Sequence, residues 1–151
     1  PVSGGLSSGF DLENKHYGVD IVMPQNSPVH SISEGIVVFS EWTSETGYVI
    51  IIEHLNGLTS IYKHNSSLVK SQGERVETGE IIAFTGNTGE LTTGPHLHYE
   101  FRVGGNHTNP LTVKLPDAKP ISKVEKKEFL DHAIKMINRL DELFLKFYAK
   151  V

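Results

Sequence analysis

Between about residues 16 and 110, short segments rich in β-branched and aromatic residues follow one another with no helical pattern between them. These segments are 35–40, 48–54, 58–64, 80–85 and 96–103. Asn56-Gly57 separates two of them, which is a strong signal for a two-residue hairpin turn of type I′. Strands that succeed each other without intervening helices favour antiparallel pairing. We therefore predict an all-β core, antiparallel, built as a two-sheet sandwich or as a barrel-like sheet.

The composition changes after Asn109-Pro110, and this change divides the chain. We predict a β domain over residues 1–110, a linker with two prolines over 111–121 and an amphipathic C-terminal α-helix over 122–151.

The helix is expected to begin near Lys123, because Ser122 and Glu125 have the spacing of a capping box. Apolar residues then recur at alternating spacings of three and four, which places them in one stripe: Leu130, Ala133, Ile137, Leu140, Phe144 and Phe147. We expect this stripe to pack on the β domain, and the alternative is that it binds a protein partner.

Composition and charge exclude several classes of function. The 151 residues carry a formal net charge of −4, which gives no basic surface for nucleic acid. No apolar run is long enough to span a membrane. The chain opens with PVSGGLSSGF, in which no signal peptide is visible, so we expect any targeting segment to lie outside this sequence. Because the chain has no cysteine and eight histidines, a transition-metal site would have to use histidine and carboxylate ligands.

The segment GPHLHYEF places two histidines on one face of a predicted strand. Residues two apart share a face, so His96, His98 and Glu100 project together, while the apolar residues between them face the core. Glu100 has two readings, as a hydrogen-bond acceptor for a ligand imidazole or as a solvated residue, and we leave it outside the predicted site.

His16 and Asp20, in the segment NKHYGVDI, supply further metal ligands. In an extended chain their Cα atoms would lie ~13 Å apart, so both can reach one ion only if the chain bends, and we expect Gly18 to allow that bend. Together with His98 they make three protein ligands and leave a fourth position for water, which is the arrangement of a catalytic zinc site. His96 and His64 would lie beside the ion as general base and oxyanion stabiliser, in an order that the sequence leaves open.

These motifs also resemble a known family. HYGVD near the start, YKH in the middle and TGPHLHYEF near the end are similar to the lysostaphin/LytM-type zinc metalloendopeptidases, which cut peptides of the bacterial cell wall, and the resemblance covers about residues 5–110. It implies that His16, Asp20 and His98 bind one zinc ion (Zn2+) per chain and that His64 and His96 are catalytic. It also implies peptidoglycan peptides as substrates, in stem peptides or cross-links, and an extracytoplasmic location.

The sequence departs from this family in places, and the departures concern the substrate groove. Lys63 stands where a small residue usually precedes the middle histidine, and Asn65 follows where leucine is common. The alternative function is a catalytically silent regulator that binds the wall or activates a partner amidase. Such a protein is expected to have lost ligands or catalytic histidines. His54 and His107, which lie near turns, are predicted to be exposed and not to bind metal.

Overall fold

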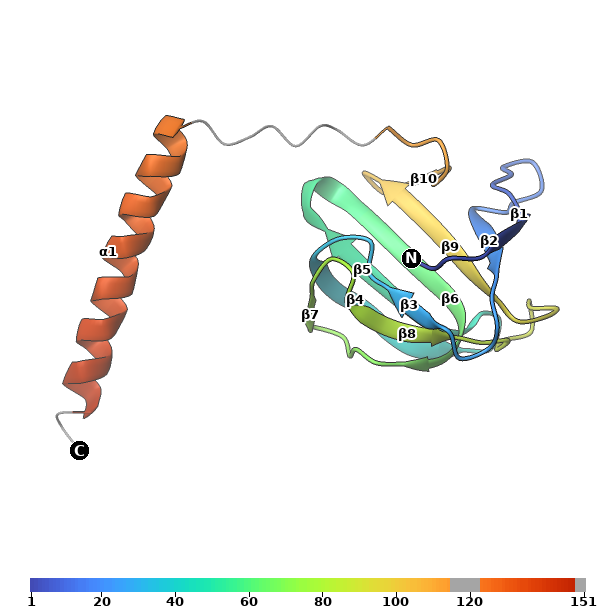
Figure 1. The fold of residues 1–151 in the computed structure, drawn as a ribbon, viewed down its shortest axis with the longest axis horizontal. Helices are drawn as coiled ribbons and strands as arrows, with labels where there is room; N and C mark the ends of the chain where they lie inside the picture. The colour runs from blue at the N-terminus through green and yellow to red at the C-terminus, as the bar shows by residue number, and fades with distance from the viewer. Residues whose placement is uncertain (115–122, 149–151) are drawn as a thin grey trace. The chain divides into compact units, whose positions relative to one another are not determined.

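The computed structural model describes residues 1–114 and 123–148. In this part of the chain ten β-strands are followed by one α-helix, α1 (Figure 1). The strands are β1 (Gly5–Ser8), β2 (Gly18–Val22), β3 (Pro28–His30), β4 (Gly35–Thr43), β5 (Gly47–His54), β6 (Leu58–Leu68), β7 (Arg75–Val76), β8 (Ile81–Thr85), β9 (His96–Val103) and β10 (Asn106–Thr108).

Every strand pair is antiparallel, as predicted. The main path of the sheet runs β1-β2-β9-β6-β5-β4-β7, with β10 paired to β9. The long strand β6 is the branch point, because it pairs with β9 and β5 and its second half also pairs with β8, which in turn pairs with β3. The all-β core with a C-terminal helix is therefore confirmed.

One buried cluster holds these strands together. It includes side chains from both branches of the sheet: Val19, Val29, Val37, Ile50, Ile52, Tyr62, Val76, Ile82, Ala83, Leu97, Tyr99 and Phe101. Each large apolar side chain buried in this way contributes about 1.5–3 kcal/mol. The apolar face predicted for β9 is confirmed, since Leu97, Tyr99 and Phe101 are all buried. The opposite face of β9 is thus left for the polar residues.

The five strands that were predicted correspond to β4, β5, β6, β8 and β9. The five that were missed have two to five residues each, which is too short for a clear alternating pattern. The predicted turn does join β5 to β6, but its loop, Leu55–Gly57, has three residues instead of two. Asn56 and Gly57 both adopt positive φ, at 63° and 70°, which explains why this dipeptide marks the turn.

The helix α1 spans Lys123–Tyr148, close to the predicted start. Ser122 of the predicted capping box and most of the predicted linker lie outside the described residues. Contacts divide the chain into two compact units, the first of which is Pro1–Val113. What the apolar stripe of α1 contacts stays a prediction. Among the described residues, no helix is long and apolar enough to cross a membrane.

We expect a chain shortened to end at Lys114 to fold on its own, because the buried cluster lies within the first unit. Its thermal unfolding should remain cooperative, with a midpoint within about 4 °C of that of the full chain, a shift that corresponds to roughly 1 kcal/mol. Calorimetry checks this, and a midpoint lowered by more than about 10 °C would mean that the helix stabilises the β unit.

Candidate metal and catalytic site

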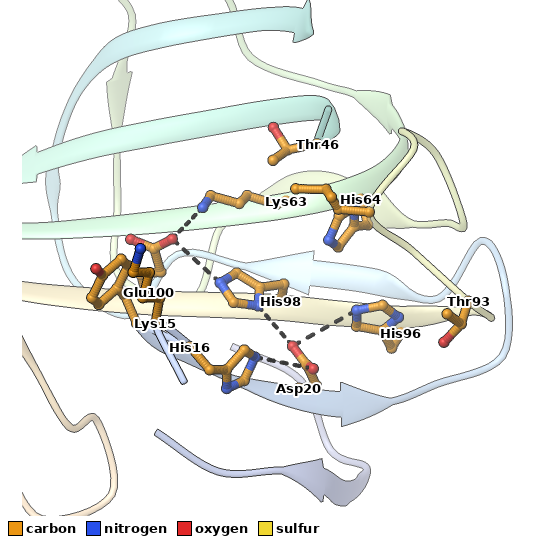
Figure 2. A pocket seen from close by; sticks show the side chains of 12 residues that line it. Lys15, His16, Asp20, Thr46, Lys63, His64, Thr93, His96, His98 and Glu100 are labelled. Atoms are coloured by element: carbon orange, nitrogen blue, oxygen red, sulfur yellow. Dashed lines mark hydrogen bonds and ion pairs between the residues drawn. The ribbon is translucent and has the colours of Figure 1, made fainter. Parts of the chain in front are cut away.

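Strand register brings most of the predicted site residues together. In the pairing of β2 with β9, Asp20 lies opposite His98 and Val22 lies opposite His96. On the other side of β9, Lys63 of β6 lies opposite His98. The carboxylate of Asp20 and the imidazoles of His96 and His98 therefore come from neighbouring strands of one sheet (Figure 2).

A tight turn positions His16. Two backbone hydrogen bonds pair His16 with Asp11, at 2.7 and 2.8 Å, and Lys15 between them adopts a positive φ of 57°. The carboxylate of Asp11 accepts hydrogen bonds from the backbone N–H groups of Glu13 and Asn14, which stabilises the turn. His16 thus has a fixed backbone at the edge of the site.

Gly18 serves the site in a way that differs from the prediction. Gly18 does not adopt a positive φ and begins strand β2, so the predicted sharp bend at Gly18 is wrong. A Cβ atom at this position would lie 2.5 Å from the carbonyl oxygen of Tyr99 and 2.9 Å from Nε2 of His98. The glycine is required because β9 and the His98 imidazole occupy the space that a side chain would take.

The three predicted ligands offer atoms that lie within 4.8 Å of one another. Nε2 of His16 is 3.1 Å from Oδ2 of Asp20, and Nδ1 of His98 is 2.7 Å from Oδ1 of Asp20. Burial alone would raise the pKa of Asp20, but the hydrogen bond and positive charge of His98 hold it below its usual value. Burial lowers the pKa of His98, and its hydrogen bonds to Asp20 and Glu100 more than offset this and raise it.

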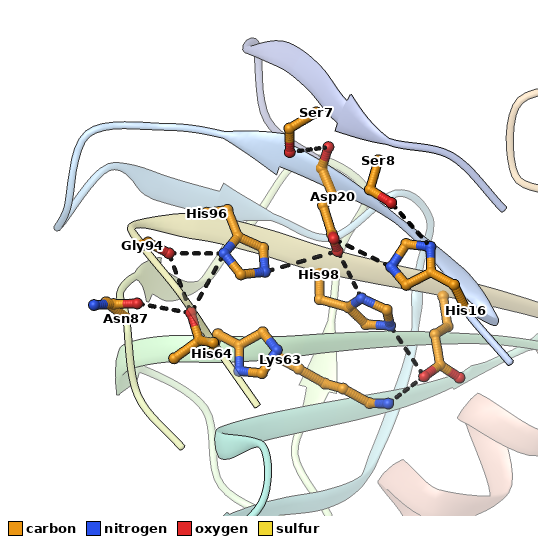
Figure 3. A network of polar contacts seen from close by, with 12 residues as sticks. Ser7, Ser8, His16, Asp20, Lys63, His64, Asn87, Gly94, His96 and His98 are labelled. Atoms are coloured by element: carbon orange, nitrogen blue, oxygen red, sulfur yellow. Dashed lines mark hydrogen bonds and ion pairs between the residues drawn. The ribbon is translucent and has the colours of Figure 1, made fainter. Parts of the chain in front are cut away.

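Three of the site histidines have one ring nitrogen bound to a backbone carbonyl, and Figure 3 shows this for His96 and Gly94. Nδ1 of His16 donates to Gly9 at 2.6 Å, Nδ1 of His64 to Thr88 at 2.9 Å, and Nδ1 of His96 to Gly94 at 2.8 Å. A carbonyl oxygen only accepts hydrogen bonds, so each Nδ1 carries a proton, and in the neutral ring the lone pair belongs to Nε2. These three histidines therefore present Nε2 to the site.

A β-bulge turns His64 into the site. Tyr48 pairs with Asn65 and Ile50 with Tyr62, so Lys63 and His64 together lie opposite the single residue between Tyr48 and Ile50. His64 adopts a positive φ of 62°, an uncommon conformation for a residue with a side chain. As a result both Lys63 and His64 line the pocket, although neighbouring residues of a regular strand point to opposite faces.

His64 is held neutral, and His96 lies close to it. Burial lowers the pKa of His64 to about 4, against the opposing effect of its hydrogen bond to Thr88. The ring centroids of His64 and His96 are 4.9 Å apart. Nε2 of His96 lies 3.7 Å from Oδ1 of Asp20, so this imidazole stands next to the three ligand atoms.

Glu100 is a member of the site that the sequence analysis set aside. Only 2% of its surface is exposed, so the solvated reading is wrong. Its carboxylate lies 3.3 Å from Nε2 of His98 and contacts the ammonium group of Lys63. The spacing of two residues from His98 was the signal that pointed to it.

The pocket over these residues has a volume of about 240 Å³, enough for an ion, several water molecules and part of a peptide. Two loops contribute to its walls: Thr46 lies between β4 and β5, and Leu91 and Thr93 lie between β8 and β9.

His54 is outside this pocket and is buried, so its predicted exposure is wrong. Its two ring nitrogens bind the carbonyl of Glu34 and the hydroxyl of Ser60, which gives it a structural role.

The donor set fits a divalent transition-metal ion. Nε2 of His16 is buried and has no hydrogen-bond partner among the described residues, although it faces Asp20. Two imidazoles and one carboxylate are ligands that zinc accepts, with the fourth position left to solvent. A buried lone pair that faces a carboxylate is also the arrangement that a bound cation would stabilise.

Comparison with known proteins identifies a matching family and several relatives. Residues 14–110 match the sequence profile of the family described as Peptidase family M23. The chain is 35% identical over 149 residues to the peptidoglycan DD-endopeptidase ShyC of Vibrio cholerae, covering 99% of this chain and 33% of that protein. It is 42% identical over 101 residues to the DD-carboxypeptidase/endopeptidase Mpg of Neisseria meningitidis, covering 67% of this chain and 23% of that protein. The chain therefore spans about a third or less of these relatives.

Solved structures agree with the fold. A zinc-containing peptidase from Vibrio cholerae superposes with a TM-score of 0.73 and 31% identity, covering 77% of this chain and 39% of that one. The catalytic domain of the peptidase lysostaphin from Staphylococcus simulans superposes with a TM-score of 0.59 and 32% identity, covering 64% of this chain and 76% of that one.

We expect Gly18→Ala to lower the free energy of unfolding by about 1–3 kcal/mol, because the new Cβ would overlap the backbone of β9. Gly5→Ala is the matched control, since a Cβ at Gly5 meets no atom within 4 Å, and its effect should stay within about 0.5 kcal/mol. Urea denaturation of the metal-free proteins measures both. Equal effects of the two substitutions would contradict the close approach at Gly18.

His64 should make the metal-free protein sensitive to acid. An unfolded chain protonates this histidine near pH 6.5, but the folded protein does so only near pH 4. The unfolded state thus binds more protons in this window, and the folded state loses stability as the pH falls through it. His64→Asn keeps a donor for Thr88 without titrating. Between pH 6.5 and 5 the variant should lose about 1–2 kcal/mol less than the original protein in urea denaturation; an equal loss would contradict the low pKa.

Proposed function

The chain belongs to peptidase family M23, and from this premise we propose that it hydrolyses peptide bonds of bacterial peptidoglycan with one zinc ion per chain. The observation that carries the proposal is the convergence of His16, Asp20 and His98, with ligand atoms within 4.8 Å of one another, beside two further imidazoles. Metal ligands alone are consistent with a structural site. Unliganded imidazoles in the same pocket are what proton transfer requires.

His16, Asp20 and His98 are the residues that would hold the ion. Bound there, zinc supplies a Lewis acid that lowers the pKa of water toward 7 and polarises the carbonyl of the peptide. The chain contributes the orientation of its own groups, because each ligand imidazole is already directed by a hydrogen bond from its other nitrogen.

His64 and His96 have different roles in proton transfer. His64 is buried and neutral, with Nδ1–H bound to Thr88, so its Nε2 lone pair is free to accept a proton from the attacking water. His96, when it carries a proton on both nitrogens, donates from Nε2 to the oxyanion that develops on the attacked carbonyl. The Nδ1–H of each ring stays on its carbonyl acceptor, so neither imidazole has to rotate during the reaction.

The proposed substrates are peptides of the stem or the cross-link. The curated relatives ShyC and Mpg are named as endopeptidases of the DD type, so we favour cross-links that contain D-alanine over glycine-rich bridges. A peptidoglycan substrate implies an extracytoplasmic location. Binding of a protein partner through α1 also stays a proposal.

A catalytically silent regulator is not favoured. Such a protein has no need for the full ligand set or for imidazoles held in place, and here both are present. The same assay distinguishes the two functions, because a regulator would release no fragments from peptidoglycan.

We expect His64→Ala and His96→Ala to retain about one zinc per chain but to lose hydrolysis by at least ~100-fold, because each removes a proton-transfer group and no ligand. His16→Ala should lose bound zinc and activity together. Purified sacculi and defined muropeptides, incubated with and without a chelator, report the activity when products are identified by mass. Metal analysis reports the zinc content.

His132→Ala is the matched control, because this histidine is exposed on α1. It should keep both zinc and activity. Loss of zinc in both His64→Ala and His96→Ala, with no loss in His16→Ala, would overturn the assignment of roles.

A further inference from the structure

Glu100 is a buried carboxylate surrounded by groups that can carry positive charge. Oε1 contacts the ammonium of Lys63 and lies 3.3 Å from Nε2 of His98, while Oε2 lies 3.4 Å from Arg102 and 3.5 Å from His107. Figure 2 shows Glu100 joined to both Lys63 and His98. A carboxylate that is 2% exposed is costly to bury unless such partners are present.

His98 is oriented differently from the other histidines of the site. Its Nε2 faces Glu100 and its Nδ1 faces Asp20, and within residues 1–114 and 123–148 no backbone carbonyl accepts from either nitrogen. Both nitrogens thus face carboxylates, which only accept hydrogen bonds, and a doubly protonated ring donates to both. If an ion replaces the proton on Nδ1, Glu100 would keep the remaining proton on Nε2. The lone pair for the ion would then be on Nδ1, the nitrogen that faces Asp20 and the ligand cluster.

Lys63 supports this arrangement from the neighbouring strand. It lies opposite His98 in the regular pairing of β6 with β9, and this register places it on the pocket side. The ammonium of Lys63 contacts Oε1, the same oxygen that faces Nε2 of His98. Lys63 therefore holds the carboxylate of Glu100 where it can accept from His98.

We propose that Glu100 is a positioning residue that fixes the tautomer of the ligand His98, and that Lys63 acts through Glu100 by holding its carboxylate in place. The proposal rests on the metal site of the proposed function. It assigns a role to Lys63 that neither ligation nor proton transfer requires. It also distinguishes Lys63 from Lys15, a second lysine that lines the same pocket but forms no ion pair with Glu100.

The test is the zinc affinity of the full chain, measured by competition with a chromophoric chelator. Glu100→Gln keeps the size of the side chain but removes its charge, and Lys63→Met removes the ammonium. Each should weaken zinc binding about 10–100-fold, the range for partners that orient a ligand histidine. Lys63→Arg retains the charge and should stay within about threefold of the original protein, and Lys15→Met should do the same.

A double variant tests whether Lys63 acts through Glu100. With Glu100→Gln already present, Lys63→Met should weaken binding by less than threefold more, because there is no charge left to hold. A second readout follows the tautomer directly. In the zinc-loaded protein, nitrogen-15 NMR should find a proton on Nε2 of His98 that exchanges slowly with water, and this signal should broaden or vanish in Glu100→Gln.

Each outcome decides the proposal. Affinity unchanged in a folded Glu100→Gln protein would overturn it, as would equal losses in Lys63→Met and Lys15→Met, or losses that multiply in the double variant. Folding is checked by urea denaturation, and the pair Lys63→Met and Lys63→Arg still decides the matter if Glu100→Gln does not fold. If the original chain binds no zinc, the proposed function fails as well; if the original and all variants bind zinc equally, only the present proposal fails.

Discussion

The site depends on one kind of interaction, a hydrogen bond from one ring nitrogen of each imidazole to a fixed acceptor. A free imidazole can rotate and exchange tautomers, so four of them in a pocket would not by themselves define a site. Here the carbonyls of Gly9, Thr88 and Gly94 each accept a proton, and the second nitrogen of each ring faces the pocket. His98 has a carboxylate as its acceptor, and it is the histidine whose other nitrogen lies nearest the carboxylate of Asp20. For His16, His64 and His96 the position of the lone pair is therefore set before any ion or substrate binds.

These acceptors can direct the imidazoles only because the backbone that carries them is itself held in place. Around His64 and Thr88 this involves strained backbone conformations. His64 adopts a positive φ at a bulge, and Thr88, whose carbonyl it contacts, donates its own hydroxyl proton to the carbonyl of Asn65. Gly47 and Gly89 allow two backbone segments to approach closely. A Cβ at Gly47 would overlap the backbone of Thr88, and a Cβ at Gly89 would overlap the backbone at Gly47. Strain of this kind persists where the surrounding contacts over-determine it, and it is frequent at functional sites.

The sequence predicted the parts of the site that follow from local geometry. Alternation along β9 was sufficient to place His96, His98 and Glu100 on one face, because the strand has a fixed period of two. The bulge at Lys63 and His64 could not be predicted, since it depends on how β6 pairs with two other strands. The sequence could not decide between the two readings of Glu100 for the same reason, because its partner Lys63 comes from another strand.

The most direct test of the account is the position of zinc in crystals of the loaded protein, located by anomalous diffraction at the zinc absorption edge. The account predicts one ion per chain bound by Nε2 of His16, a carboxylate oxygen of Asp20 and Nδ1 of His98, with solvent as the only other ligand. An ion bound elsewhere, or a fourth ligand from the protein at this position, would contradict it.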